Sequence, residues 1–576
     1  MRTGIWVDGE FGWCDSDDWE IHQAYEEGSL VGSSVWRSWR LGIEVAVTEA
    51  LDPAEPVFVR TFLVTDLRGL GRGVRLFTSQ NFILGQSDVG NTAFWNPFCE
   101  AVVHYRGPYY AIVALRSESG RHAQFATGLT GFGNLEGTWR DAEDGDLSGN
   151  PIAQGSVDST MGIGVASDGR DPVRMVLVCG SRLDESVALF QGAEARGWDA
   201  VFESARQDGA SCEDRAETVD LGRFSQKVKD VYDRSLHVIR SQIDAEGAVV
   251  AANDSDILLT NRATYSYCWP RDGACVSRLM AEIGFPEVAE RFLSFCTRVE
   301  PHDQPFFLQK YRSDGNLGAS WHPWVINGRP EVPFQEDESA LVLLLLAERA
   351  PTLPGDWGPF GHKLARAIVD HRSDDGLPKP SWDLWEERHG VHFFTSCLVV
   401  AALKAAAVAW SEPTYTNAAD ETLAGIEATF WNGTRYRRML ADETPDSAVL
   451  GGMLFCPELR ADRQSATLAD LDAALSVPGA VGGLARYAGD YYFRKTEAAP
   501  GNPWIISTMW SARMHARVGD VDRAEALVEW AAERAETTGI LAEQYHPETG
   551  EPLSVSPLTW SHSEYMETVR ALATSP

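Results

Sequence analysis

Residues 381–395 read Ser381-Trp-Asp-Leu-Trp-Glu-Glu-Arg-His-Gly-Val-His-Phe-Phe-Thr395, with two adjacent carboxylates after two tryptophans and just before an apolar helical run. A carboxyl group pressed against aromatic rings loses water, which raises its pKa and suits it to donate a proton near neutral pH. Tryptophan faces beside carboxylates also suit a sugar ring. The alternative is an amphipathic helix entry, with Asp383, Glu386 and Glu387 near the positive end of the helix dipole. Taken alone, the stretch favours neither interpretation.

Working outward, the apolar run that follows is one of a series of helical patterns that continues to the C-terminus. Loops between the patterns are alternately short and long, and the long ones carry Trp, Arg, Asp and Glu. This organisation predicts a closed ring of helical hairpins, with the long loops at one mouth. An open solenoid is the alternative, but the sequence has no fixed-period repeat to support it. The predicted helices are 224–239, 273–283, 286–299, 337–348, 361–371, 393–409, 417–430, 466–473, 503–518, 521–536 and 560–574.

The N-terminal third has a different pattern. From Gly4 to about residue 205, short alternating stretches such as 33–49, 57–66 and 109–115 are separated by Gly, Pro, Asp and Ser turns, with almost no helical period. Such spacing predicts an antiparallel β-sandwich. The fold class is therefore multidomain, β then all-α. The predicted boundaries are 1–206 for the sandwich, 207–245 for a polar linker with the first helix, and 246–576 for the helical domain.

Composition limits the class of partner. The chain has 576 residues, enough for more than one core, and its 44% apolar and 23% charged content is that of a soluble protein. Its 50 basic and 83 acidic residues give a formal charge of −33, which argues against nucleic acid and anionic membranes as partners. No apolar run approaches the roughly 20 residues of a membrane span. Nine scattered cysteines without a Cys-x-x-Cys pair indicate reduced thiols. Without a signal-peptide pattern, we expect a cytoplasmic protein.

A second motif, Tyr265-Ser-Tyr-Cys-Trp-Pro-Arg-Asp-Gly-Ala274, precedes a predicted helix. Its adjacent Arg271 and Asp272 could hold neighbouring sugar hydroxyls, one as donor and one as acceptor. The alternative is a helix-capping Asp272 with Arg271 paired elsewhere, and from this motif alone the alternative is the better interpretation.

Taken together, the motifs resemble those of the glucoamylase family, glycoside hydrolase family 15. The resemblance follows the family's order and covers nearly the whole chain, including the β-domain of bacterial and archaeal members. Each motif alone is weak to moderate, but six in order are highly specific. They are 265–274, Gln335-Glu-Asp337, Trp382-Asp-Leu-Trp-Glu-Glu387 with His392-Phe-Phe-Thr395, Arg486-Tyr487, Gly501-Asn-Pro-Trp504, and Glu543-Gln-Tyr545 with Leu558-Thr-Trp-Ser561.

The resemblance implies an (α/α)6 barrel whose pocket removes glucose from a non-reducing end with inversion of configuration. Glu386 matches the family's general acid and Glu543 its general base. In an inverting site the two carboxyls stand roughly 6.5–9.5 Å apart, with room for a water molecule between. We expect the acid to be dry and protonated and the base to be wet and ionised.

The resemblance also assigns residues that bind substrate. Arg271 and Asp272 match residues that hold the distal hydroxyls of the terminal glucose, and Glu387 matches a carboxylate that contacts the next sugar. A tyrosine near the base is matched by Tyr265. For Asp337 a helix cap is the alternative, and for the Trp321–Trp324 loop core packing is as good an interpretation as sugar contact. The other predicted substrate-binding residues are Trp321, Trp324, Gln335, Asp337, Trp385, Arg486, Trp504 and Trp560.

Two departures from the family bear on substrate. Relatives with this β-domain usually carry a further leading segment, so either the sandwich lacks edge strands or the start codon is misassigned. A starch-binding appendage and a secretion signal are also missing from the pattern. Small intracellular α-glucosides, trimmed glycogen or maltodextrins are therefore the expected substrates.

The sequence is compatible with three functions to different degrees. An exo-α-glucosidase could cleave an α-1,4, an α-1,6 or the α,α-1,1 bond of trehalose, because all three present the same glucosyl unit. An inverting phosphorylase on the same barrel would carry a basic cluster where Glu543 stands. An inactive glucan-binding protein would lack a carboxylate, and both are present. No metal or organic cofactor is implied, and no EF-hand spacing occurs. Oligomeric state leaves no signal in the sequence.

Overall fold

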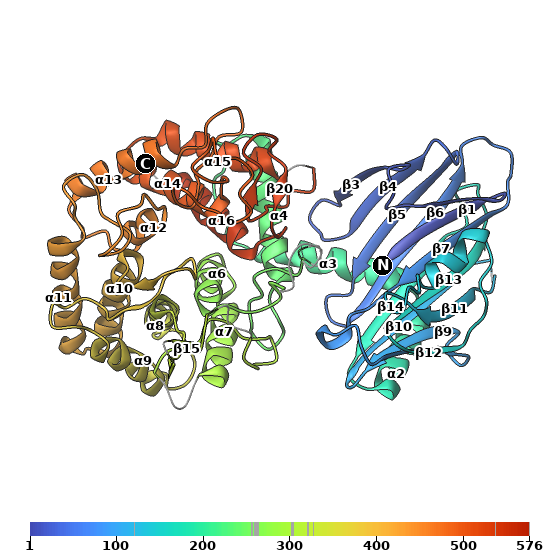
Figure 1. Cartoon of the computed structure of the whole chain (residues 1–576), viewed down its shortest axis with the longest axis horizontal. Coiled ribbons are helices and arrows are strands. Elements are labelled where there is room, and N and C mark those ends of the chain that lie inside the picture. Colours follow the sequence, from blue (N-terminus) through green and yellow to red (C-terminus); the bar gives the residue numbers. More distant parts are fainter. Residues whose placement is uncertain are drawn as a thin grey trace. The chain divides into compact units, whose positions relative to one another are not determined.

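The protein is described by a computed structural model that covers residues 1–119, 121–254, 257, 264–300, 305–318, 322–326, 328–535 and 537–574. The chain divides into two compact units, Met1–Asp214 and Arg215–Pro576. The first unit consists mainly of strands and the second mainly of helices (Figure 1).

Within residues 1–119 and 121–214, the first unit holds a five-stranded sheet in the order β11-β13-β7-β1-β2 and a nine-stranded sheet in the order β12-β8-β9-β10-β14-β6-β5-β4-β3, with antiparallel pairing throughout. The strands are β1 (Arg2–Val7), β2 (Glu10–Trp13), β3 (Glu20–Tyr25), β4 (Gly32–Ser38), β5 (Ile43–Leu51), β6 (Val57–Asp66), β7 (Val74–Gln80), β8 (Asn91–Asn96), β9 (Ala101–Arg106), β10 (Tyr109–Ser117), β11 (Gln124–Leu129), β12 (Ile152–Gly155), β13 (Val157–Val165) and β14 (Val173–Gly180).

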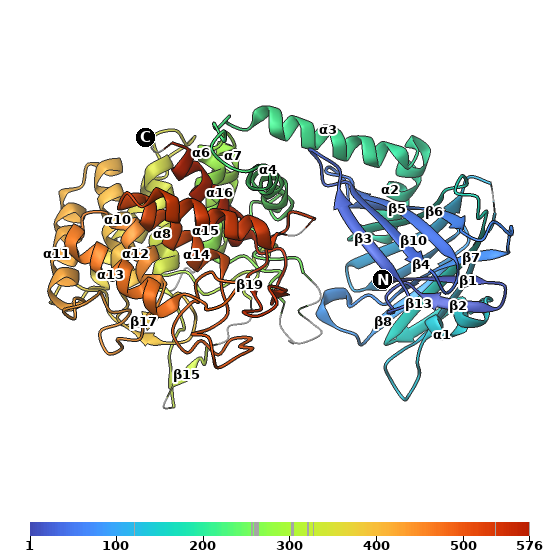
Figure 2. The same cartoon turned by 90° about the horizontal axis from the view of Figure 1, so that it is seen from above.

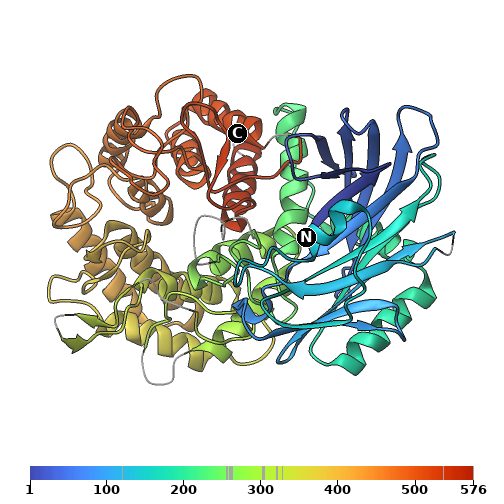
Figure 3. The same ribbon diagram turned by 45° about the vertical axis from the view of Figure 1, so that its right-hand side comes forward.

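The two sheets belong to the first unit (Figure 3). Residues of both sheets make up a common apolar core. Alternation along β5 turns Ile43, Val45 and Val47 inward, and on the paired strand β6 Val64 lies opposite Val45 and Phe62 opposite Val47. Ile163 and Leu76 from the smaller sheet belong to the same core. Because period-two alternation buries one face of each strand, the sequence pattern was sufficient to predict this sandwich.

The end of the first unit differs from the prediction. Residues expected to be strand or linker form α2 (Leu183–Arg196) and α3 (Asp199–Arg215), so residues 207–215 are helical rather than an extended linker. A second core, between the larger sheet and these helices, contains Phe190, Val201 and Phe202, and α2 packs on β10 and β14 (Figure 2). The shorter helical elements are η1 (Leu84–Gln86), α1 (Thr138–Asp141) and η2 (Ala142–Asp144).

Among the described residues of the second unit, six inner helices form a closed ring. Each packs against the next, and the last packs against the first (Figure 1). They are α6 (Pro270–Glu282), α8 (Glu336–Arg349), α10 (Phe393–Trp410), α12 (Ala448–Phe455), α14 (Ile505–Arg517) and α16 (Thr559–Ala573). The outer helices are α4 (Gln226–Ser241), α7 (Pro286–Val299), α9 (Gly358–Asp370), α11 (Pro413–Thr429), α13 (Ala461–Leu475) and α15 (Val521–Arg534). This arrangement is the predicted (α/α)6 barrel.

The connections of the barrel are unequal. Outer helices reach the next inner helix through long loops, such as residues 371–392 before α10, whereas α10 joins α11 through residues 411–412 alone. All the long loops therefore lie at the N-terminal ends of the inner helices. Three contain short hairpins: β15 (Val325–Ile326) with β16 (Arg329–Pro330), β17 (Ser381–Trp382) with β18 (His389–Gly390), and β19 (Gln544–Tyr545) with β20 (Pro552–Leu553).

Helix α10 is the one described helix that is long and apolar enough to cross a membrane, which the sequence analysis did not expect. Within its 18-residue window, 67% of residues are buried inside the protein, and the helix packs against α8, α11 and α12. Its apolar surface is therefore accounted for by the core of the barrel.

Candidate active site

A cavity of about 330 Å³ opens where the long loops meet the N-terminal ends of α6, α14 and α16. Its walls come from segments far apart in sequence, between Ala251 and Trp560. Most of the predicted site residues line it, namely Tyr265, Arg271, Asp272, Trp385, Glu386, Glu387, Arg486, Trp504, Glu543 and Trp560.

Both carboxylate oxygens of Glu386 and its backbone are hydrogen-bonded. Trp269 Nε1 donates to Oε1 at 2.6 Å, and Gln309 Nε2 donates to Oε2. The backbone N–H of Glu386 donates to the Asp383 carbonyl at 2.9 Å, and His322 Nε2 lies 3.0 Å from the Glu386 carbonyl oxygen. The backbone of Glu386 has a φ of 63°, a left-handed conformation that is costly for a residue with a Cβ atom. Such strain persists where surrounding contacts enforce it, as they do here.

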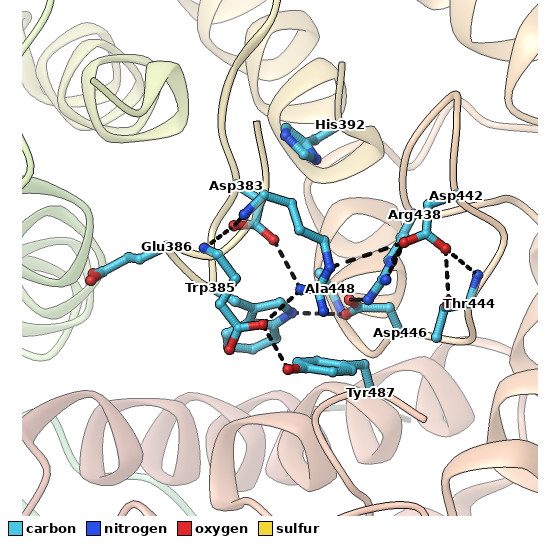
Figure 4. A network of polar contacts seen from close by, with 12 residues as sticks. Asp383, Trp385, Glu386, His392, Arg438, Asp442, Thr444, Asp446, Ala448 and Tyr487 are labelled. Atoms are coloured by element: carbon cyan, nitrogen blue, oxygen red, sulfur yellow. Dashed lines mark hydrogen bonds and ion pairs between the residues drawn. The ribbon is translucent and has the colours of Figure 1, made fainter. Parts of the chain in front are cut away.

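The loop that carries Glu386 is organised by Asp383 (Figure 4). Its Oδ1 accepts the backbone N–H groups of Glu387 at 2.7 Å and Arg388 at 2.9 Å, which closes a tight turn around Glu386. From the same loop, Trp385 donates its indole N–H to Asp446 at 2.9 Å. The position of the Glu386 backbone is thus fixed by the fold of its own loop.

Glu543 lies directly before β19, and only 5% of it is exposed. Burial raises its pKa from 4.5 to about 7, although a hydrogen bond with Ser554 and the charge of Arg486 oppose the shift. The expectation of a dry Glu386 and a wet Glu543 is therefore wrong for this structure, because Glu386 is only partly buried while Glu543 is almost fully enclosed. Sequence could not show this, since the burial of Glu543 comes from distant loops.

Two tyrosines connect to Glu543. The hydroxyls of Tyr265 and Tyr492 are 2.6 Å apart, and the Tyr492 hydroxyl is 3.4 Å from the Ser554 hydroxyl, which in turn bonds Glu543. Burial raises the pKa of Tyr265 well above its ordinary value, and the nearby Glu543 charge adds to the shift. Tyr265 therefore keeps its proton and can orient a water molecule beside Glu543.

Arg271 lies among carboxylates at the start of α6. It is 3.3 Å from Asp272 and from Asp337, and 3.7 Å from Glu338 and from Glu386. Burial raises the pKa of Asp272 and of Asp337 to about 6, against the opposing effect of Arg271. The cluster presents one cation and one carboxylate to the cavity, which is the donor and acceptor set predicted for this motif.

Glu387 has three donors of its own. Arg486 donates to Oε1 at 2.6 Å, and Tyr487 and Arg388 donate to Oε2 at 2.6 and 2.8 Å. Asp490 holds Arg486 through two further bonds at 2.9 and 2.8 Å. This pairing fixes a second charged patch in the cavity wall, separate from Arg271.

Three predicted residues lie elsewhere. Gln335 is fully buried and donates to the Asp383 carbonyl at 2.5 Å, and Asp337 pairs with Arg271 behind the cavity wall. Both support the site without lining it. Trp324 is 42% exposed and does not line the cavity either. Trp321 lies outside the described residues.

Several lining residues were not predicted. Trp269 stood inside the quoted motif 265–274, so a signal existed for it, whereas none of the six motifs includes Tyr491 or Tyr492. Nothing in the sequence marks Ala251, which reaches the cavity through tertiary packing. In the part of the chain that the structure describes, no three His, Cys, Asp or Glu side chains gather in a group that could hold a metal ion.

The chain is similar to several known proteins. The family described as Glycosyl hydrolases family 15 matches residues 334–520. An uncharacterized glycosyl hydrolase of Methanocaldococcus jannaschii is 22% identical over 601 aligned residues, covering 96% of this chain and 90% of the relative. The isomaltose glucohydrolase of Kribbella flavida is 26% identical over 416 residues, covering 63% of this chain and 95% of that protein.

Among solved structures, a bacterial glucoamylase complexed with acarbose matches with a TM-score of 0.81 at 17% identity, covering 99% of this chain and 88% of that one. At this identity the likeness shows the fold alone, and it extends through both units. The predicted order of a β-sandwich followed by an (α/α)6 barrel is confirmed. The phosphorylase and the inactive glucan-binding protein receive no support from these relatives.

Proposed function

This chain is a glycoside hydrolase of family 15, and from that premise we propose that it is an exo-acting, inverting α-glucosidase. It would release β-glucose from the non-reducing end of small α-glucosides or glucans. The observation that carries the proposal is that Glu386 and Glu543, from the loops before α10 and α16, line one cavity. Two carboxylates facing one sugar are the minimum that an inverting mechanism requires.

In the proposed reaction, Glu386 gives its proton to the glycosidic oxygen while the bond from that oxygen to C1 breaks. Glu543 takes a proton from a water molecule whose oxygen attacks C1 from the opposite face. The products are an alcohol and β-glucose, so one water is consumed. The proton gained by Glu543 then returns to Glu386 through solvent. A base with a pKa of about 7 is well matched to this work near neutral pH.

The other lining residues suit a terminal glucose. Arg271 and Asp272 are both buried and offer a donor and an acceptor for neighbouring hydroxyls. Trp560 and Trp385 offer ring faces for the C–H side of the sugar. Glu387 with Arg486 would contact the next sugar, toward the leaving group.

The linkage remains one of three: α-1,4, α-1,6 or α,α-1,1. The name of the Kribbella relative supports a small glucoside, because that protein acts on isomaltose. The test incubates the protein separately with maltose, isomaltose and trehalose and follows the anomers by NMR. Early β-glucose from one disaccharide identifies both linkage and stereochemistry; trehalose would yield one β- and one α-glucose. Early α-glucose as the sole product would overturn the inverting assignment.

The roles of the two carboxylates are tested by Glu386→Gln and Glu543→Gln. Each variant should lose at least about a hundredfold in kcat while still binding substrate, because general acid–base catalysis contributes that much. Binding is measured by isothermal titration with the disaccharide that the wild type cleaves. A variant that keeps a near-normal rate shows that its carboxyl has another role.

A further inference from the structure

The partners of the Glu386 carboxylate point to a residue with no role so far. Trp269, directly before α6, donates to Oε1, and Gln309, in the long loop between α7 and α8, donates to Oε2. A carboxylate with one N–H donor on each oxygen cannot rotate about its last bond without breaking both. Gln309 was not predicted from the sequence, because no motif includes it.

Gln309 is itself rigidly placed. Tyr311, two residues further on, exchanges backbone hydrogen bonds with Cys268 at 2.7 and 2.8 Å. The Tyr311 hydroxyl also accepts the Leu308 N–H at 2.8 Å. Gln309 is only 1% exposed. The segment that carries Gln309 is therefore paired with the segment that carries Trp269, and the two donors are fixed relative to each other.

Lys310 strengthens the same arrangement. Its Nζ lies 4.9 Å from the ring centroid of Trp269 and 5.0 Å from that of Tyr267. A cation close to an indole face is attracted by the ring's quadrupole, which helps to hold the indole of Trp269 in place. Gln309 by contrast donates from a neutral amide. The amide can fix the geometry of Oε2 without adding a second cation to Arg271, which already lies 3.7 Å from Oε1.

We propose that Gln309 is the positioning residue for the proton that Glu386 delivers. By holding Oε2, it sets the direction in which the carboxyl faces the glycosidic oxygen. The inference rests on the proposed function, since it assumes that Glu386 is the acid. It concerns protonation of the leaving group alone, and this separates it from a general role in folding.

The experiment compares two substrates of Gln309→Met, which removes the donor but keeps an unbranched side chain of similar length. One substrate is the disaccharide that the wild type cleaves, and the other is α-glucosyl fluoride, whose fluoride leaves with little help from an acid. We expect kcat on the disaccharide to fall about ten- to a hundredfold, a part of what general acid catalysis supplies. On the fluoride we expect a change of less than about threefold.

A second variant reports on charge. Gln309→Glu places a carboxylate beside Glu386, and a like charge favours the protonated acid. The alkaline limb of the pH profile of kcat on the disaccharide should therefore move to higher pH. This readout stays informative if Gln309→Met folds poorly, because it depends on the position of the limb and not on the amount of active protein.

The matched control is Gln464→Met. Gln464 is a buried glutamine on α13 that donates to the carbonyl oxygens of Leu459 and Pro457 and does not line the cavity. Any loss in this variant should be equal on both substrates. Equal losses on both substrates for Gln309→Met, or an unmoved alkaline limb for Gln309→Glu, would overturn the inference. Failure of the proposed function looks different: Glu386→Gln would then keep its rate on the disaccharide.

Discussion

At the scale of single residues, the site depends on the hydrogen bonding and burial of two glutamates. Glu386 is immobilised by donors to both carboxylate oxygens, while Glu543 is enclosed and its pKa is raised by burial. Sequence motifs identified both residues because their neighbours are characteristic. The motifs could not indicate which glutamate is the more deeply buried, since burial depends on residues of other segments, such as Tyr265, Arg486 and Ser554 around Glu543.

The raised pKa of Glu543 predicts the acid limb of the pH profile. Glu543 must be ionised to accept a proton, so kcat/KM should fall about tenfold per pH unit below about 7. Ser554→Ala removes a hydrogen bond that stabilises the ionised form, and the limb should then move to higher pH. The measurement is kcat/KM on the cleaved disaccharide across the pH range. A limb at the ordinary glutamate value of 4.5 would contradict this reading of the burial.

At the scale of elements, the helices differ in how readily the sequence pattern predicts them. The segment Ala448–Phe455, which forms α12, was missed because it is apolar along nearly its whole length and is buried on all sides. Such a helix has no polar face and so no period to detect. By contrast, α7 was predicted with its observed bounds, since Pro286 opens it and its apolar residues recur on one face.

The loop 381–390 offers a test of preorganisation. Asp383→Ala removes the acceptor for two backbone N–H groups and should loosen the turn that holds Glu386. Because a small misplacement of a catalytic group is costly, we expect kcat to fall about ten- to a hundredfold. Thermal unfolding should change little, since the turn is local.

The control for this variant is Asp375→Ala. Asp375 caps a similar turn in the same connection through the Leu377 N–H at 3.1 Å, but it does not line the cavity. If both variants lose activity to the same extent, the turn at Asp383 has no special part in placing Glu386.

Helix α8 begins with a buried acidic residue, Glu336. It is 0% exposed, and its carboxyl oxygens have no hydrogen-bond partner among the described residues. Burial raises its pKa well above 4.5, and Asp337 adds to the shift. Its contribution to stability is thus present at low pH and is lost as pH rises toward the folded-state pKa.

Glu336→Gln should remove the loss of stability that the Glu336 carboxyl causes as pH rises. Relative to the wild type, the variant should be more stable at pH 8 than at pH 5, by about 1–3 kcal/mol in the free energy of unfolding. The measurement is thermal or urea unfolding at both pH values. Glu497→Gln, at a side chain that is 90% exposed, serves as the control and should show no such difference. An identical pH dependence in Glu336→Gln and the wild type would contradict the prediction.

At the scale of the whole molecule, the strongest physical signal is the formal charge of −33. Like charges across a surface repel, and salt screens them. We expect the melting temperature to rise with NaCl up to a few hundred millimolar. In contrast, kcat/KM on a neutral disaccharide should stay constant, because no charge steers the substrate. A melting temperature that falls with salt would indicate that paired charges outweigh the repulsion.

Fold class was the most predictable property at this scale. Period-two alternation before Gly180 and helical periodicity after Phe224 separate the two units without any tertiary information. Residues 207–215 were predicted to be a linker because their polar composition, with Asp, Glu, Arg and Ser, is shared by linkers and exposed helices. Closure of the ring could be expected from loop lengths, but the residues that meet in the cavity could be named only where motifs marked them.

The two ends of the closed ring of helices should differ in how well they tolerate changes in sequence. Among the described residues, the groups that line the cavity lie at the end where the inner helices begin, and the opposite end carries shorter links such as residues 411–412. A detection peptide or surface anchor inserted there would leave turnover untouched. The end with the short links is therefore suited to insertions, and the end with the long loops is where substitutions would change substrate preference.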